Sequence, residues 1–120
     1  MRHVVLLSVL IGVTAVCGSA QAHARLDRAE PKVGSKVKTS PTEMKIWFTD
    51  DVEVVDTSIE VFDSGGNRVD KNDLHVDAKD QSLATVSLPA QLASGKYKVV
   101  WRAKCHDQHK THGEFTFVVQ

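Results

Sequence analysis

The chain has 120 residues, which is enough for one domain, and its 42% hydrophobic and 25% charged residues are typical of a globular protein. Fifteen lysines and arginines balance fifteen aspartates and glutamates, so no overall field attracts nucleic acid or an anionic membrane. The composition thus argues against a second domain and against a nucleic-acid partner, and we expect recognition to be local.

The first 22 residues are predicted to be a cleaved secretory signal peptide. A positive start at Arg2 precedes an apolar run from Val4 to Val16, and Ala20-Gln21-Ala22 forms a small-x-small cleavage site. The apolar run is shorter than the roughly 20 residues of a membrane-spanning helix, so we expect no membrane span after processing. Removal of residues 1–22 would leave an exported domain of residues 23–120 that begins with His23.

The first half of this domain shows the alternating pattern of β-strands and no helical period. Apolar and polar residues alternate from Met44 to Phe48 and again from Ile59 to Phe62. The glycine-rich segment 63–67 then predicts a turn, and we expect a strand to return after it.

The second half gives the clearest strands. Leu83 to Leu88 is an apolar-rich strand that ends at Pro89, and Lys96 to Lys104 has one apolar and one polar face. The last strand is predicted around residues 114–119, and the polar, histidine-rich segment 106–113 is predicted to be the loop before it. Six or seven short strands indicate an all-β sandwich of two sheets with Greek-key connections.

That loop and the new amino terminus carry the residues with metal-binding chemistry. An N-terminal His23 would offer its amine and its imidazole to one metal ion in a chelate ring, and a divalent ion can displace the amine proton near neutral pH. Asp107 and His109 can add a carboxylate and a second imidazole, because residues two apart on an extended segment project to the same side. Three nitrogens and one oxygen form a tetragonal set that suits Cu(II).

At both ends of the domain the sequence resembles the CopC/PcoC family of periplasmic copper-binding proteins. At the start the resemblance rests on the segment His23-Ala24-Arg25-Leu26, with Ala29-x-Pro31 and Gly34 after it. At the end it rests on Gly95-x-Tyr97-x-Val99-x-Trp101-Arg102, followed by Asp107-x-His109, Gly113, Phe115-x-Phe117 and Val119.

The resemblance implies a seven-stranded, immunoglobulin-like or cupredoxin-like sandwich and one Cu(II) ion per chain, bound by His23, Asp107 and His109. It also implies a carrier or buffer in copper homeostasis or resistance, not an enzyme, with a CopD-like inner-membrane copper transporter as partner. Some members hold Cu(I) in a methionine-rich loop. Here the single methionine after processing, Met44, lies at an apolar position of a strand, so we expect no thioether site.

The surroundings of the motif depart from the family and leave several roles open. Cys105 stands where serine is usual and shares the parity of the apolar face, which favours a buried side chain over a metal-bound thiolate. His106 is expected to face away from the metal by parity, while His112 could reach back across a turn. His75 is expected at the surface.

Two other functions compete with the carrier. A copper-dependent oxidative enzyme can also use an N-terminal histidine with another histidine, but a carboxylate ligand and a small domain argue against it. A metal-free sandwich that serves as an interaction module would show no high-affinity metal binding.

Overall fold

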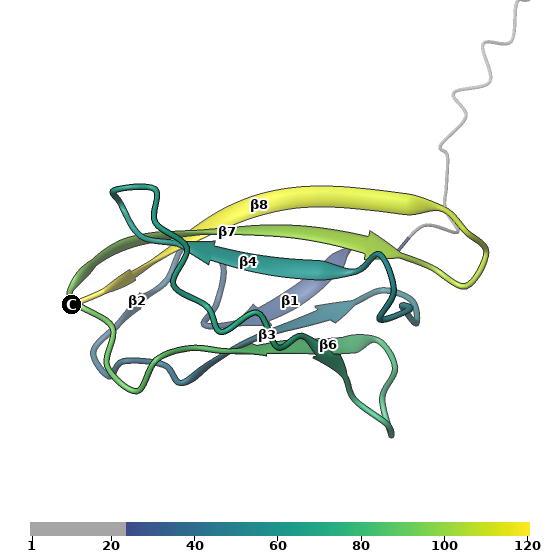
Figure 1. Cartoon of the computed structure of the whole chain (residues 1–120), viewed down its shortest axis with the longest axis horizontal. Coiled ribbons are helices and arrows are strands. Elements are labelled where there is room, and N and C mark those ends of the chain that lie inside the picture. Colours follow the sequence, from purple (N-terminus) through teal and green to yellow (C-terminus); the bar gives the residue numbers. More distant parts are fainter. Residues whose placement is uncertain (1–23) are drawn as a thin grey trace, which may run out of the picture.

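The computed structural model describes residues 24–120, which form two packed four-stranded sheets (Figure 1). The first sheet has the order β1 (Leu26–Glu30), β3 (Glu43–Phe48), β6 (Leu83–Ser87) and β5 (His75–Val76). The second has the order β2 (Lys36–Val37), β8 (Lys110–Val119), β7 (Gly95–Lys104) and β4 (Ser58–Phe62). The predicted signal segment 1–22 and His23 lie outside the described residues. Residues 24–120 contain no helix that is long and apolar enough to span a membrane.

The alternation seen in the sequence builds the core between the two sheets. In β3, in β7 and in the second half of β8 every second side chain is buried, and the members are Met44, Ile46, Phe48, Tyr97, Val99, Trp101, Ala103, Phe115, Phe117 and Val119. These strands therefore have one dry and one solvent-facing side. The predicted all-β sandwich is confirmed. The described residues form eight strands where seven were expected, and two of them, β2 and β5, are short pairings of two residues each.

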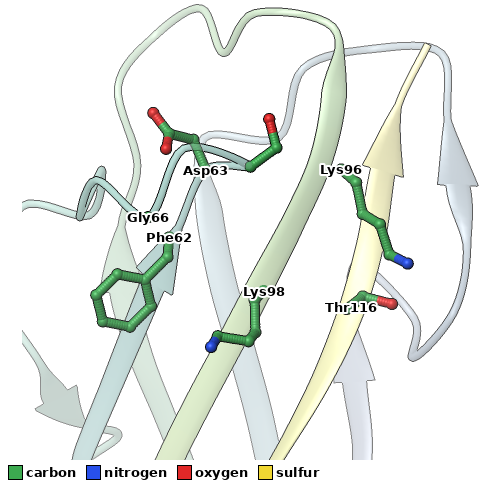
Figure 2. A pocket seen from close by; sticks show the side chains of 7 residues that line it. Phe62, Asp63, Gly66, Lys96, Lys98 and Thr116 are labelled. Carbon is green, nitrogen blue, oxygen red and sulfur yellow. The ribbon is translucent and has the colours of Figure 1, made fainter.

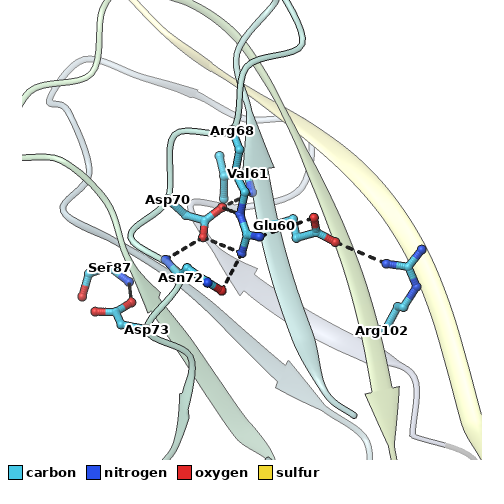
Figure 3. Close-up of polar contacts among 8 residues, drawn as sticks. All are labelled: Glu60, Val61, Arg68, Asp70, Asn72, Asp73, Ser87 and Arg102. Atoms are coloured by element: carbon cyan, nitrogen blue, oxygen red, sulfur yellow. Dashed lines mark hydrogen bonds and ion pairs between the residues drawn. The ribbon is translucent and has the colours of Figure 1, made fainter.

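The prediction that a strand returns after the turn at residues 63–67 is wrong. Beyond that turn, Arg68 makes one isolated bridge to Phe62, and the next strand, β5, pairs in the other sheet. A side chain takes the place of the missing ladder, because the Asp70 carboxylate accepts a hydrogen bond from the Val61 N–H at 2.8 Å (Figure 3). The edge of β4 is thus satisfied without a full partner strand.

The loop after β7 is shorter than the sequence predicts. We expected a loop over residues 106–113, but β8 already begins at Lys110 and pairs with the end of β7, so that His112 lies opposite Arg102. Polar residues suit this position because their side chains face solvent while the backbone ladder continues. The connection is reduced to residues 105–109, which confines Asp107 and His109 to a tight turn.

The start of the described chain and the β7–β8 loop lie at the same end of the sandwich. β1 begins at the end of the molecule where β7 is joined to β8 (Figure 1). Residues far apart in the sequence, at the start of the domain and near position 107, are neighbours there.

Candidate metal centre

The β7–β8 loop is closed by hydrogen bonds of its own backbone. The Cys105 N–H donates to the His109 carbonyl at 3.0 Å, and the Gln108 N–H donates to the Cys105 carbonyl at 3.0 Å. Gln108 has a φ of 75°, a left-handed conformation that lets the chain reverse. The hairpin therefore holds Asp107 and His109 within one narrow turn.

Asp107 and His109 face each other, but a tight turn brings them together where we expected an extended segment. The His109 Nδ1 lies 3.0 Å from the Asp107 Oδ2, and the His109 N–H donates to the Asp107 Oδ1 at 3.1 Å. The side chain of His109 is 58% exposed and that of Asp107 is 41% exposed. A separation near 3 Å fits two neighbouring ligands of one ion, given metal–nitrogen and metal–oxygen bonds of about 2.0–2.2 Å.

The start of the described chain is fixed against this loop. The Ala24 N–H donates to the Cys105 Sγ at 2.9 Å, and the Thr111 hydroxyl donates to the Ala24 carbonyl at 2.5 Å. The Arg25 N–H in turn donates to the Thr49 Oγ1 at 2.9 Å. Ala24 is fully buried, so the residue that follows His23 is held beside the turn that carries Asp107.

Cys105 occupies the position that its parity predicts. It is buried with 3% of its surface exposed, and it follows the core strand β7. The interpretation as a buried side chain is confirmed. The sequence did not reveal its contact with Ala24, nor that of Thr111. Both residues lie at inward-facing positions of the alternating pattern, which was the available signal. This pattern does not show which residue an inward-facing side chain contacts.

The remaining histidines point elsewhere. His106 Nδ1 lies 3.3 Å from Glu53 Oε1, which agrees with its expected orientation away from Asp107. His112 does not lie in a turn from which it could reach back, because it belongs to β8. It is exposed, and so is His75 in β5, as expected for His75. Among residues 24–120, no cluster of three or more histidine, cysteine or acidic side chains could hold a metal by itself.

A shallow cavity of about 490 Å³ adjoins the loop and is lined by Thr49, Asp50, Asp51, Ser82, Cys105, His106 and Asp107. Its three carboxylates attract a cation that approaches the loop. A second cavity of about 510 Å³ is lined by residues that include Phe62, Lys96 and Lys98 (Figure 2). It lies at the start of β7, and therefore at the opposite end of this strand from Asp107 and His109.

The most connected polar cluster of the described residues also lies apart from the loop. Arg68 donates two hydrogen bonds to Asp70, at 2.9 and 3.0 Å, and lies 3.7 Å from Glu60, which also pairs with Arg102 (Figure 3). Burial by itself raises the pKa of Asp70, but the hydrogen bonds from Arg68 and from backbone N–H groups outweigh it and lower the pKa. This cluster supports the edge of β4 and has no donor directed at the loop.

Comparison with known proteins places the chain among copper-related proteins. It is 30% identical over 98 residues to the copper transport protein CutJ of Bacillus subtilis, a match that covers 82% of this chain and 18% of CutJ. It is 26% identical over 111 residues to protein YobA of Escherichia coli, covering 92% of this chain and 90% of YobA. The chain thus spans less than a fifth of the length of CutJ and nearly all of YobA.

Solved structures with the same fold include two copper proteins. CopC from Methylosinus trichosporium OB3b superposes with a TM-score of 0.76 at 32% identity, covering 82% of this chain and 94% of that one. PcoC from Escherichia coli, a methionine-rich copper resistance protein, superposes with a TM-score of 0.72 at 24% identity, covering 82% of this chain and all of PcoC. Residues 26–120 also match the CopC domain. The chain therefore belongs to the CopC domain family.

Proposed function

We propose that this protein carries or buffers Cu(II) in the periplasm, at one site formed by His23, Asp107 and His109 after removal of residues 1–22. Its family and its similarity to a CopC and to a copper transport protein support copper as the cargo. The proposal assigns no catalytic group. The CutJ match, in which a similar domain makes up part of a longer copper transport protein, supports exchange of copper with a CopD-like membrane transporter.

One observation carries the site. The hydrogen bond of 2.9 Å from the Ala24 N–H to the Cys105 Sγ holds Ala24, the sequence neighbour of His23, beside the turn that carries Asp107 and His109. The pair alone offers two donors, and a tetragonal ion needs about four. An N-terminal His23 would add an amine and an imidazole, which completes a set of three nitrogens and one oxygen.

The donor set supports Cu(II) as the oxidation state of the proposed cargo. Nitrogen and carboxylate oxygen ligands suit Cu(II), whereas Cu(I) is selected by soft thiolate and thioether sulfur. Met44 is fully buried in the core, which agrees with the expectation that it forms no thioether site. Reduction of the bound ion would then weaken its binding and favour release to a partner.

The decisive experiment moves the amine without altering any side chain. Cu(II) is titrated into the processed protein and into a chain with a Gly-Ser-Gly-Ser extension before His23, in competition with a chromophoric chelator. We expect the extension to weaken binding by about two orders of magnitude or more, because the chelate ring of His23 is lost.

The matched control carries the same extension after Gln120, and we expect it to bind like the processed protein. Mass spectrometry of exported protein determines the first residue in parallel. Equal affinity of both extended chains, or a mature chain that begins at another residue, would contradict the proposal.

A further inference from the structure

We propose that Cys105 is a positioning residue of the copper site, which joins the Asp107–His109 turn to the start of the mature chain. This inference rests on the Cu(II) site proposed above. The site draws its ligands from two segments that are more than 80 residues apart in the sequence. Some residue must hold the two segments in register, because ligands that are misplaced by about 0.5 Å already lose a productive geometry.

The main chain of Cys105 fixes the first segment. Its N–H donates to the His109 carbonyl and its carbonyl accepts from the Gln108 N–H, both at 3.0 Å. These two hydrogen bonds enclose Asp107, so the turn is closed by Cys105 at its base. An isolated bridge to Val52 ties the same residue to the neighbouring segment of the sandwich.

The side chain of Cys105 fixes the second segment. Its Sγ accepts the Ala24 N–H at 2.9 Å, and both residues are buried. The peptide unit is planar, so the Ala24 N–H lies in one plane with the Cα of the preceding residue. The thiol therefore anchors the amide nitrogen of Ala24, the sequence neighbour of the proposed ligand His23. A buried N–H that loses its acceptor is costly, so this contact resists displacement.

Thr111 holds the other side of the same residue. Its hydroxyl donates to the Ala24 carbonyl at 2.5 Å. Cys105 directly follows β7 and Thr111 belongs to β8. The two sides of the hairpin therefore both bind Ala24, Cys105 through the N–H of Ala24 and Thr111 through its carbonyl. Rotation of the peptide before Ala24 would break the hydrogen bond to Cys105, the residue that also closes the turn.

The test compares the processed protein with three variants of the residues that bind Ala24 and with one control. Cys105→Ala removes the acceptor, Cys105→Ser keeps one, and Thr111→Val removes the second contact. Val99→Ala is the control, since Val99 is fully buried in β7, the strand that Cys105 directly follows, and its six-residue separation from Cys105 corresponds to about 20 Å.

The measurements are the Cu(II) dissociation constant, the electron paramagnetic resonance spectrum of the bound ion, and the exchange rate of the Ala24 amide in the metal-free protein. For Cys105→Ala and Thr111→Val we expect a dissociation constant raised about tenfold, with a changed copper spectrum. For Cys105→Ser we expect a dissociation constant within about threefold of wild type. Ala24 exchange should accelerate in Cys105→Ala and not in Val99→Ala, although Val99→Ala lowers stability.

Two results would overturn the inference while the proposed function stands. One is a Cys105→Ala protein whose affinity and copper spectrum equal those of the wild type. The other is an intense thiolate-to-copper absorption band in the wild type, which would make Cys105 a ligand. A wild-type protein that binds no Cu(II) would instead remove the proposed function and this inference together, whatever the Ala24 exchange rate shows.

Discussion

Replacement of Gly113 by alanine tests the packing that supports the β7–β8 hairpin. Gly113 lies in β8 directly opposite Trp101 in β7, and the indole ring lies over its Cα. A Cβ at this position would lie 2.6 Å from Cζ2, 2.8 Å from Cε2 and 3.0 Å from Nε1 of Trp101. Carbon atoms in contact normally keep about 3.5–4.0 Å between them, so the ring would have to move by about 1 Å.

The ring has little room to move. Trp101 is only 7% exposed, and its ring meets Phe48 edge to face at a centroid distance of 5.4 Å. Overpacking of this kind costs about 1–3 kcal/mol of the free energy of unfolding. For a domain of this size each kcal/mol lowers the melting temperature by about 4–8 °C, so we expect a decrease of about 4–24 °C.

Thermal unfolding followed by circular dichroism measures the effect. Gly65→Ala is the control, because its added Cβ would meet only the ends of the Asn67 and Asp63 side chains, at 3.3 and 3.4 Å. In a Trp101→Phe background the penalty of Gly113→Ala should shrink, since the atoms that clash are absent. A Gly113→Ala protein as stable as Gly65→Ala, or a penalty that is unchanged by Trp101→Phe, would refute the reasoning.

Two further predictions concern the site and the acid stability of the fold. Asp107→Asn and His109→Ala should each weaken Cu(II) binding by about a hundredfold in the chelator competition. His106→Ala should stay within about twofold because this histidine pairs with Glu53, and equal losses in all three variants would contradict the assignment. The lowered pKa of Asp70 means that its charged form stabilises the fold fully above the ordinary value of 3.8, and that this stability is lost as pH falls through the lower folded value. The urea midpoint should therefore fall by less from about pH 6 to about pH 3 in Asp70→Asn than in the wild type. Equal decreases in the two proteins would argue against a charge effect.

Much of the fold could be predicted from local patterns in the sequence. A period of two decides which face of a strand is buried, and this is why the inward residues of β3, β7 and β8 and the position of Cys105 are confirmed. Asp107 and His109 meet as expected, although a tight turn joins them where we expected an extended segment. Such inferences hold because they depend on residues that are close in the chain.

Other features depend on partners that no local pattern names. The shortened turn at residues 105–109 arises because β8 continues to pair with β7 through polar residues, and backbone pairing does not require apolar side chains. The absent return strand is replaced by the Asp70 carboxylate at the edge of β4. Cys105 and Thr111 both form hydrogen bonds with Ala24, from which they are 81 and 87 residues away in the sequence. The sequence by itself determined which residues face inward and which can bind a metal, whereas only the packing of the two sheets decided which distant segments these residues hold together.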